Sequence, residues 1–194
     1  MNLNKSILKR FKDGMDAAVE AGVTEPTAMS VATVGPNDRV SSRMMLLKHF
    51  DSKGFIFFTN MTSRKGVQLT DIPKIAATFF WGKIEQQVRI EGVVEKISTK
   101  ESDSYFASRP RISQVGAWVS QQSQLLKSKA VLENKVIEFA KLHEGQKILR
   151  PKHWGGIRII PDRIEFWYGR KYRLHERIQY KAEATNWLVT RLYP

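Results

Sequence analysis

The sequence contains no cysteine. Disulfide bridges, zinc–thiolate sites and a cysteine nucleophile are therefore excluded, and any redox chemistry must come from a bound cofactor. Long apolar runs are also missing: no stretch approaches the roughly 18 residues that a membrane span needs, and the first residues lack the apolar centre of a secretory signal. We therefore expect a cytoplasmic protein with no membrane partner.

Several familiar enzyme motifs are absent as well. The sequence has no GxGxxG, no Walker loop, no HExxH and no GxSxG, so the Rossmann, P-loop, zinc-protease and serine-hydrolase classes lack their signatures. The four histidines, His49, His143, His153 and His175, show no metal-ligand spacing. We therefore expect no metal site.

What the sequence has in excess is positive charge, with a formal net charge of +13. Such a charge indicates anionic partners, which include nucleic acid, a membrane surface and small phosphorylated ligands. The basic residues are scattered as singles or pairs, which disfavours nucleic acid and suits either several phosphate pockets or no specific ligand. Hydrophobic residues make up 42% of the chain and no linker or repeat divides it, so we expect a single folded domain over residues 1–194.

Three helices are expected from local patterns. Apolar residues at helical spacing predict an N-terminal helix over residues 3–21. A capping-box pattern at residues 98–101 starts a second helix, which should run to about Ala107 before Pro110 ends it. Another apolar face predicts a helix over residues 128–142. Residues 99–142 therefore form a helical section.

Runs rich in β-branched and aromatic residues, separated by turn residues, predict short strands within residues 28–98 and 154–192. Short strands joined by tight turns indicate a mainly antiparallel sheet or barrel. The expected fold is thus α+β, a β-barrel with peripheral helices. The expected strands are 28–34, 39–50, 55–59, 75–81, 87–97, 156–160, 164–168, 173–180 and 187–192, with a turn at Pro161 and Asp162.

Basic residues beside hydroxyl groups are the candidate binding residues. Arg43 and Lys48 fall in one predicted strand, where alternation puts them on opposite faces unless a bulge intervenes; solvated charges at strand ends are an equal alternative. Thr59–Gly66 reads as a strand end, a polar turn and a helix start, a geometry that directs N–H groups, hydroxyls and cations to one anion. An ordinary capped helix with a nearby lysine fits that pattern too.

Tyr105, Arg109 and Ser113 are spaced four apart, which on one helix would place them on a single face. Because Pro110 interrupts that helix, we expect a helix end to meet the start of the next one. All three side chains can donate to a phosphate in that arrangement. Surface polar residues at a helix break are the alternative interpretation.

The run Arg173-Leu174-His175-Glu176-Arg177 alternates strictly. In a strand, Arg173, His175 and Arg177 would share one face while Leu174 would point to the core. Two cations that flank a histidine suit an anion site, whereas a solvated barrel face is the simpler alternative.

These features belong to an ordered set of short segments, each weak alone: Arg43–Lys48, Phe57–Asn60, Ser63–Lys65, Gln87–Val88, Tyr105–Arg111, Ser113–Gln114, Gln122–Ser123, Trp154–Gly156, Glu165–Trp167 and Arg173–Arg177. Together, over nearly the full chain, they resemble the pyridoxamine 5'-phosphate oxidase family. The resemblance implies an FMN-binding split β-barrel that works as a homodimer with FMN at the interface. It also implies oxidation of pyridoxamine or pyridoxine 5'-phosphate to pyridoxal 5'-phosphate by O2, which releases H2O2, and NH3 from the amine.

The resemblance also assigns residues. It implies that FMN is bound by Arg43, Met44, Met45, Leu46, Leu47, Lys48, Phe58, Thr59, Arg64, Lys65, Gln87, Gln122, Ser123, Trp167 and Arg177. The implied substrate set is Lys48, Tyr105, Arg109, Ser113, Arg173, Leu174 and His175, with Arg173 and His175 as the catalytic residues. Two alternatives stay open: a related split-barrel flavin oxidase with another ring substrate, such as a phenazine precursor, and a non-catalytic protein that binds FMN or pyridoxal phosphate.

Overall fold

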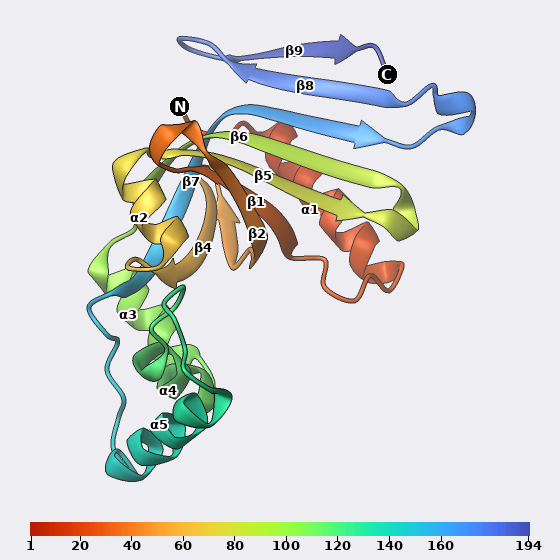
Figure 1. Ribbon diagram of the computed structural model, residues 1–194. Helices are drawn as coiled ribbons and strands as arrows, with labels where there is room; N and C mark the ends of the chain where they lie inside the picture. Colours follow the sequence, from red (N-terminus) through yellow and green to blue (C-terminus); the bar gives the residue numbers. More distant parts are fainter.

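The computed structural model describes residues 1–194 and is built on one curled sheet (Figure 1). The sheet has nine strands, and every pairing between them is antiparallel. The strands are β1 (Ala28–Val34), β2 (Val40–Leu46), β3 (His49–Asp51), β4 (Gly54–Asn60), β5 (Lys74–Trp81), β6 (Gln86–Lys96), β7 (Trp154–Tyr168), β8 (Glu176–Ala182) and β9 (Trp187–Leu192).

Strand β7 connects the two parts of the sheet. Its first half pairs with β4 and its second half with β8, while β6 pairs along almost its whole length. The strand order is β2-β1-β5-β6-β7-β4-β3, and β8 and β9 continue the sheet from the second half of β7. The sheet therefore curls as a barrel on one side and opens on the other, as Figure 1 shows.

Five α-helices accompany the sheet: α1 (Lys5–Glu20), α2 (Arg64–Asp71), α3 (Thr99–Ser108), α4 (Arg111–Val119) and α5 (Lys129–Leu142). Helix α1 closes the barrel, because its buried Phe11 meets the edges or faces of Phe50, Phe55 and Phe79 at ring distances of 4.8 to 5.3 Å. Helices α3, α4 and α5 extend away from the sheet at the end where β7 begins (Figure 1). None of the helices is both long enough and apolar enough to cross a membrane.

The predicted helices are confirmed to within two residues at each end. The side chain of Asn4 caps α1, and Ser98 and Glu101 form the expected capping box at the start of α3. A small apolar cluster of Phe106, Val115, Ile148 and Trp154 holds the α3–α4 pair against the start of β7, separate from the main core of 23 residues. The α+β split-barrel prediction is confirmed as well.

The prediction of a turn at Pro161 and Asp162 is wrong, because β7 runs unbroken through both residues. The register between β6 and β7 shifts at Gly92, opposite Pro161. A Cβ on Gly92 would lie 2.2 Å from the carbonyl oxygen of Ile160, so only glycine permits this close approach. The irregularity at Gly92 accommodates the proline within the long strand.

The strand expected over residues 173–180 begins later, so the alternation inferred for its first residues is wrong. Lys171–Arg173 forms a short 3-10 turn in which Tyr172 and Arg173 have positive φ angles of 59° and 60°. Leu174 is 68% exposed and does not face the core. The physical reason is the connection from β7 to β8, which needs these residues for the turn. The strand expected over residues 39–50 is likewise divided into β2 and β3.

Candidate functional site

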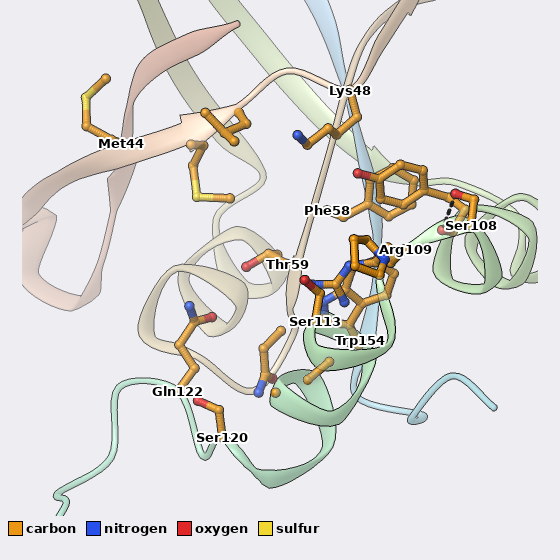
Figure 2. A pocket seen from close by; sticks show the side chains of 17 residues that line it. Met44, Lys48, Phe58, Thr59, Ser108, Arg109, Ser113, Ser120, Gln122 and Trp154 are labelled. Carbon is orange, nitrogen blue, oxygen red and sulfur yellow. Dashed lines mark hydrogen bonds between the residues drawn. The ribbon is translucent and has the colours of Figure 1, made fainter. Parts of the chain in front are cut away.

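The principal cavity of the protein, of about 700 Å3, lies between the ends of β2 and β4 and the junction of α3 with α4 (Figure 2). No acidic side chain lines it. Its walls are Met44, Met45, Leu46, Lys48, Phe58, Thr59, Asn60, Tyr105, Ser108, Arg109, Pro110, Ser113, Gly116, Ala117, Ser120, Gln122 and Trp154. The cavity therefore presents cations and neutral donors with no carboxylate to oppose an anion.

The junction of α3 and α4 places Tyr105, Arg109 and Ser113 in this cavity. Arg109 is the C-cap residue of α3 and Pro110 the N-cap residue of α4, so a helix end meets the start of the next helix, as the sequence predicted. The side-chain amide of Gln114 donates to the carbonyl oxygens of Phe106, Ala107 and Arg109 at 3.1 to 3.3 Å. These bonds satisfy carbonyls that a helix end leaves free and fix the backbone of Arg109.

The guanidinium of Arg109 is held by an aromatic ring. Its Cζ lies 4.6 Å from the centre of the Trp154 ring, and its Nη1 is buried without a hydrogen-bond partner. Burial lowers the pKa of Arg109 from its ordinary value, because the charged form loses hydration. Burial also raises the pKa of the Tyr105 phenol, which therefore stays a neutral hydrogen-bond donor. An anion in the cavity would satisfy the free N–H group of Arg109.

A second group of cations lies at the start of α2. Ser63 caps this helix by accepting from the N–H of Gly66 at 3.3 Å and donates to the carbonyl of Asn60 at 2.6 Å. The ammonium of Lys65 donates to Gln122 Oε1 at 3.1 Å. Burial and the nearby charge of Arg43 lower the pKa of Lys65 to about 8. The strand-turn-helix geometry expected at Thr59–Gly66 is therefore present.

Arg43 belongs to the same group. It donates from Nη1 to Thr33 Oγ1 at 2.6 Å and from Nη2 to Ser41 Oγ at 2.8 Å, which ties its guanidinium to β1 and β2. Burial, followed by the charge of Arg64, lowers its pKa from the ordinary value. None of Arg43, Arg64 and Lys65 forms an ion pair with an acidic side chain. Three neighbouring cations without an acidic partner are suited to an anion.

A smaller cavity of about 360 Å3 adjoins these cations and is lined by both Arg64 and Ser123. Ser123 has a positive φ of 73° and directly follows Gln122, which lines the principal cavity. The two cavities therefore lie on either side of the Gln122–Ser123 segment. Together they bring most of the predicted FMN residues that lie outside β6, β7 and β8 to one region.

The remaining predicted residues form a second group on the open part of the sheet. Gln87, Trp167 and Arg177 are direct cross-strand partners in β6, β7 and β8. The His175 ring lies 4.7 Å from the Trp167 ring, and its Nδ1 lies 3.2 Å from the backbone N–H of Arg170. Since a backbone N–H can only donate, Nδ1 accepts, and the neutral ring carries its proton on Nε2.

The two groups lie far apart within one chain. Trp154, in the principal cavity, is the first residue of β7, and Trp167 is near its last. At about 3.3 Å per residue the strand between them is roughly 40 Å long, measured along its bent course. Figure 1 accordingly shows the β7–β8 turn and helices α3 and α4 at different ends of the molecule. A single chain therefore does not bring the two groups into one cleft.

Some assigned residues lie outside both groups, and some residues of the cavity were not assigned. Leu47 is buried in the main core, and Leu174 points to solvent. In the sequence, Trp154 and Gln114 belong to segments that resemble the family, but the resemblance assigns neither of them a binding or catalytic role. No spacing rule connects Trp154 with Arg109, because only the tertiary fold brings β7 beside α3.

A flavin mononucleotide fits the residues present. The hydroxyl of Thr59 is buried in the wall of the principal cavity without a hydrogen-bond partner. Beside it are the cations Arg43, Arg64 and Lys65, none of which has an acidic partner, and burial lowers the pKa of Arg43 and of Lys65. A phosphate-bearing ring compound would supply both the missing counter-charge and the missing polar partner.

Comparison with known proteins agrees with this geometry. Residues 15–143 match the family model described as pyridoxamine 5'-phosphate oxidase, and residues 154–194 match the pyridoxine 5'-phosphate oxidase C-terminal dimerisation region. A pyridoxine/pyridoxamine 5'-phosphate oxidase of Gloeothece citriformis is 49% identical over 192 residues, which cover 98% of this chain and 90% of that protein. Another, of Trichormus variabilis, is 50% identical over 187 residues, which cover 96% and 87% respectively.

Among solved structures, PhzG of Burkholderia lata in complex with tetrahydrophenazine-1-carboxylic acid matches with a TM-score of 0.90 at 32% identity, over 97% of this chain and 91% of that one. A pyridoxamine 5'-phosphate oxidase-related, FMN-binding protein of Nostoc punctiforme, at 15% identity and a TM-score of 0.78 over the full length of both chains, shares the fold. The curled antiparallel sheet with its cation-lined cavity thus defines a split-barrel oxidoreductase of the flavin-binding type. The chain belongs to the pyridoxine/pyridoxamine 5'-phosphate oxidase family.

Proposed function

We propose that this protein is an FMN-dependent oxidase that converts pyridoxamine 5'-phosphate and pyridoxine 5'-phosphate to pyridoxal 5'-phosphate. O2 is the electron acceptor, H2O2 is released, and the amine substrate also yields NH3. The observation that carries the proposal is the convergence of Lys48, Tyr105, Arg109 and Ser113 in a cavity without an acidic side chain. That donor set suits the phosphate of a small substrate, in a cavity that is also lined by residues which the family resemblance assigns to FMN.

The substrate phosphate is close to dianionic, so its desolvation must be offset by cations and hydrogen-bond donors. Arg109 supplies a buried N–H group that lacks a partner, and Lys48 supplies a second charge. The hydroxyls of Tyr105 and Ser113 add neutral donors. Held in this way, the phosphate orients the pyridine ring toward the wall formed by Met44, Met45 and Leu46.

FMN would be held by residues around both cavities. Arg43, Arg64, Lys65 and Ser123 suit its phosphate, while Thr59 and Gln122 suit the polar atoms of the ring system. When bound, FMN supplies the chemistry of the reaction by taking a hydride from C4' of the substrate and passing the electrons to O2. The protein positions the two rings and supplies positive potential around them.

The separation of the two residue groups supports a homodimer with FMN at the interface. Gln87, Trp167 and Arg177, together with Arg173 and His175, would complete the site of a second copy. The match of residues 154–194 to a dimerisation region supports the same arrangement. In a two-fold dimer each copy would lend this group to the other, which gives two equivalent sites.

The tautomer of His175 suggests its task. Because Nδ1 accepts from the backbone N–H of Arg170, the neutral ring offers Nε2–H as a donor and has no free lone pair for a substrate proton. His175 would then orient the reacting end of the substrate by donating a hydrogen bond, together with Arg173. It would not act as the base in this state.

A second candidate keeps the fold and changes the substrate. The similarity to PhzG, whose structure contains a tetrahydrophenazine carboxylic acid, favours a ring compound without a phosphate. The donors Tyr105, Arg109 and Ser113 argue against this candidate, because a ring compound without a phosphate needs fewer hydrogen-bond donors at this place. The two candidates differ in whether removal of the substrate phosphate abolishes turnover.

The deciding experiment uses the purified full chain. We expect a yellow protein with a flavin spectrum that forms peroxide and aldehyde from both phosphorylated substrates, and far less product from unphosphorylated pyridoxamine. Arg173→Leu should lower turnover while FMN stays bound. A protein that remains colourless and inactive after FMN addition would refute the proposal, and a yellow protein without peroxide would indicate a binding protein only.

A further inference from the structure

Trp154 forms one wall of the principal cavity and is 7% exposed. It begins β7, where it pairs with Asn60 of β4, and it lies in the small apolar cluster that joins α3 and α4 to the sheet. The Arg109 guanidinium lies over its ring at 4.6 Å from the ring centre. Figure 2 shows the two side chains together at the wall of the cavity, beside Ser113.

The indole ring is itself held in a stack of aromatic rings. Phe58 lies 5.2 Å from the Trp154 ring at an interplanar angle of 12°, and Tyr105 stacks on Phe58 at 3.9 Å and 17°. Phe106 packs edge-on against Trp154 at 5.3 Å and 70°. The orientation of the indole is therefore fixed from two directions, and the same stack carries the Tyr105 phenol.

An aromatic ring holds a guanidinium differently from a carboxylate. A carboxylate accepts the in-plane N–H groups and neutralises the charge, so it would compete with a phosphate for both. A ring face attracts the cation from above its plane and leaves the N–H groups free. Arg109 has no acidic partner, and its Nη1 is buried without a hydrogen bond. The tryptophan therefore fixes Arg109 while its charge and donors stay available.

We propose that Trp154 is the positioning residue for Arg109 and so sets the preference of the site for phosphorylated substrates. The proposal rests on the proposed function, which places the substrate phosphate at Arg109. Trp154 does not touch the reacting atoms. It acts through the guanidinium, whose N–H groups it keeps directed into the cavity.

The first test compares Trp154→Leu with Trp154→Phe. We expect Trp154→Leu to lower the ratio of kcat/KM for pyridoxamine 5'-phosphate to that for pyridoxamine by roughly tenfold, the effect of a desolvated cation–π contact. The loss should appear in KM for the phosphorylated substrate, with kcat much less affected. Trp154→Phe keeps a ring face and should recover most of the ratio. Trp118→Leu, a half-exposed tryptophan outside the cavity, should leave the ratio unchanged.

A merely structural role would lower the amount of folded, flavin-loaded enzyme and would affect both substrates equally, which would overturn the proposal. The second test is a double-mutant cycle: in an Arg109→Leu background, Trp154→Leu should change the ratio by less than about twofold. If Trp154→Leu changed the ratio as much in the Arg109→Leu background as in the native protein, the proposal would also be overturned.

A binding measurement separates this proposal from the proposed function. Inorganic phosphate, titrated by calorimetry into the flavin-loaded protein, should bind roughly tenfold more weakly to Trp154→Leu, and nearly normally to Trp154→Phe. This holds even if the unmodified chain proves to oxidise neither substrate, which would refute only the proposed function. Equal phosphate affinity in all three proteins would refute the role of Trp154.

Discussion

Arg177 and Glu165 are joined by two parallel hydrogen bonds across β8 and β7, from Nε to Oε1 at 2.8 Å and from Nη2 to Oε2 at 3.0 Å. The carboxylate is 4% exposed and also accepts from Arg89 at 3.4 Å. The hydrogen bond with Glu165 raises the pKa of Arg177 above its ordinary value. Glu165 therefore fixes the direction of an arginine that the family resemblance assigns to FMN.

Glu165→Gln should lower the free energy of unfolding by about 2 kcal/mol, because an amide cannot satisfy two arginines at a buried position. It should also weaken FMN binding, since Arg177 loses its fixed orientation. Denaturant unfolding and flavin fluorescence measure the two effects. Glu91→Gln, which removes a more exposed partner of Arg89, should change stability by less than about 1 kcal/mol. Equal effects of both variants would contradict this role of Glu165.

The lowered pKa of Lys65 makes FMN affinity depend on pH. In the free protein its pKa is about 8. A bound phosphate favours the charged ammonium and raises that pKa, so binding takes up a proton at pH values above about 8. The affinity for FMN should therefore fall as pH rises. The Kd for FMN should increase by up to about tenfold between about pH 8 and about pH 9.

Quenching of flavin fluorescence, measured across this pH range, tests the prediction. Lys65→Arg keeps its charge throughout and should flatten the dependence. Lys129→Met, at an exposed lysine on α5, should preserve it. If the pH dependence of the FMN affinity persisted in Lys65→Arg, a titratable group other than Lys65 would cause it.

Gln114→Leu should affect both stability and the substrate site. The amide of Gln114 donates to three carbonyl groups at the end of α3. The Phe106 carbonyl would keep the backbone N–H of Arg109 as a donor, but the substitution takes the amide donor away from the carbonyls of Ala107 and Arg109. We expect a loss of about 1–3 kcal/mol in the free energy of unfolding and a higher KM for the phosphorylated substrate, because the backbone of Arg109 is released. Gln146→Leu, at an exposed glutamine, is the matched control. An unchanged KM in a destabilised Gln114→Leu would limit this residue to folding.

Local sequence patterns predicted those features that depend only on residues close together in the chain. The capping box at Ser98 and Glu101 and the cap at Ser63 depend on residues three positions apart, so the sequence displays them directly. The Tyr105–Arg109–Ser113 set is similarly contained in one helix junction. Alternation failed at Arg173, because period-two spacing also occurs in a turn whose left-handed residues are not glycine.

Sequence spacing could not predict the contacts between segments that lie far apart in the chain. Trp154 meets Arg109 across 45 residues, and Arg177 meets Glu165 only because β7 and β8 pair in that register. The register in turn depends on the turn at Lys171–Arg173 that the pattern did not predict. The family resemblance supplied the residues of the site, while their distribution over two ends of one chain became visible only in the fold.

That distribution leads to a prediction about mixed dimers. If each site combines Arg109 of one copy with Arg173 of the other, then Arg109→Leu and Arg173→Leu should each be nearly inactive alone. A mixed dimer would place both substitutions in one site and leave the other site with two native arginines. Random assembly makes half of the dimers mixed, so co-expression should restore about a quarter of native activity.

The measurement compares specific activity per bound FMN in the two variants, in the co-expressed mixture, and in a mixture of separately purified dimers that do not exchange. Only the co-expressed sample should gain activity. Activity that stays between the levels of the two single variants would mean that the site takes Arg109 and Arg173 from the same chain. The position of the two groups at opposite ends of the 15-residue strand β7 argues against that outcome, because side-chain movement alone does not bridge the length of such a strand.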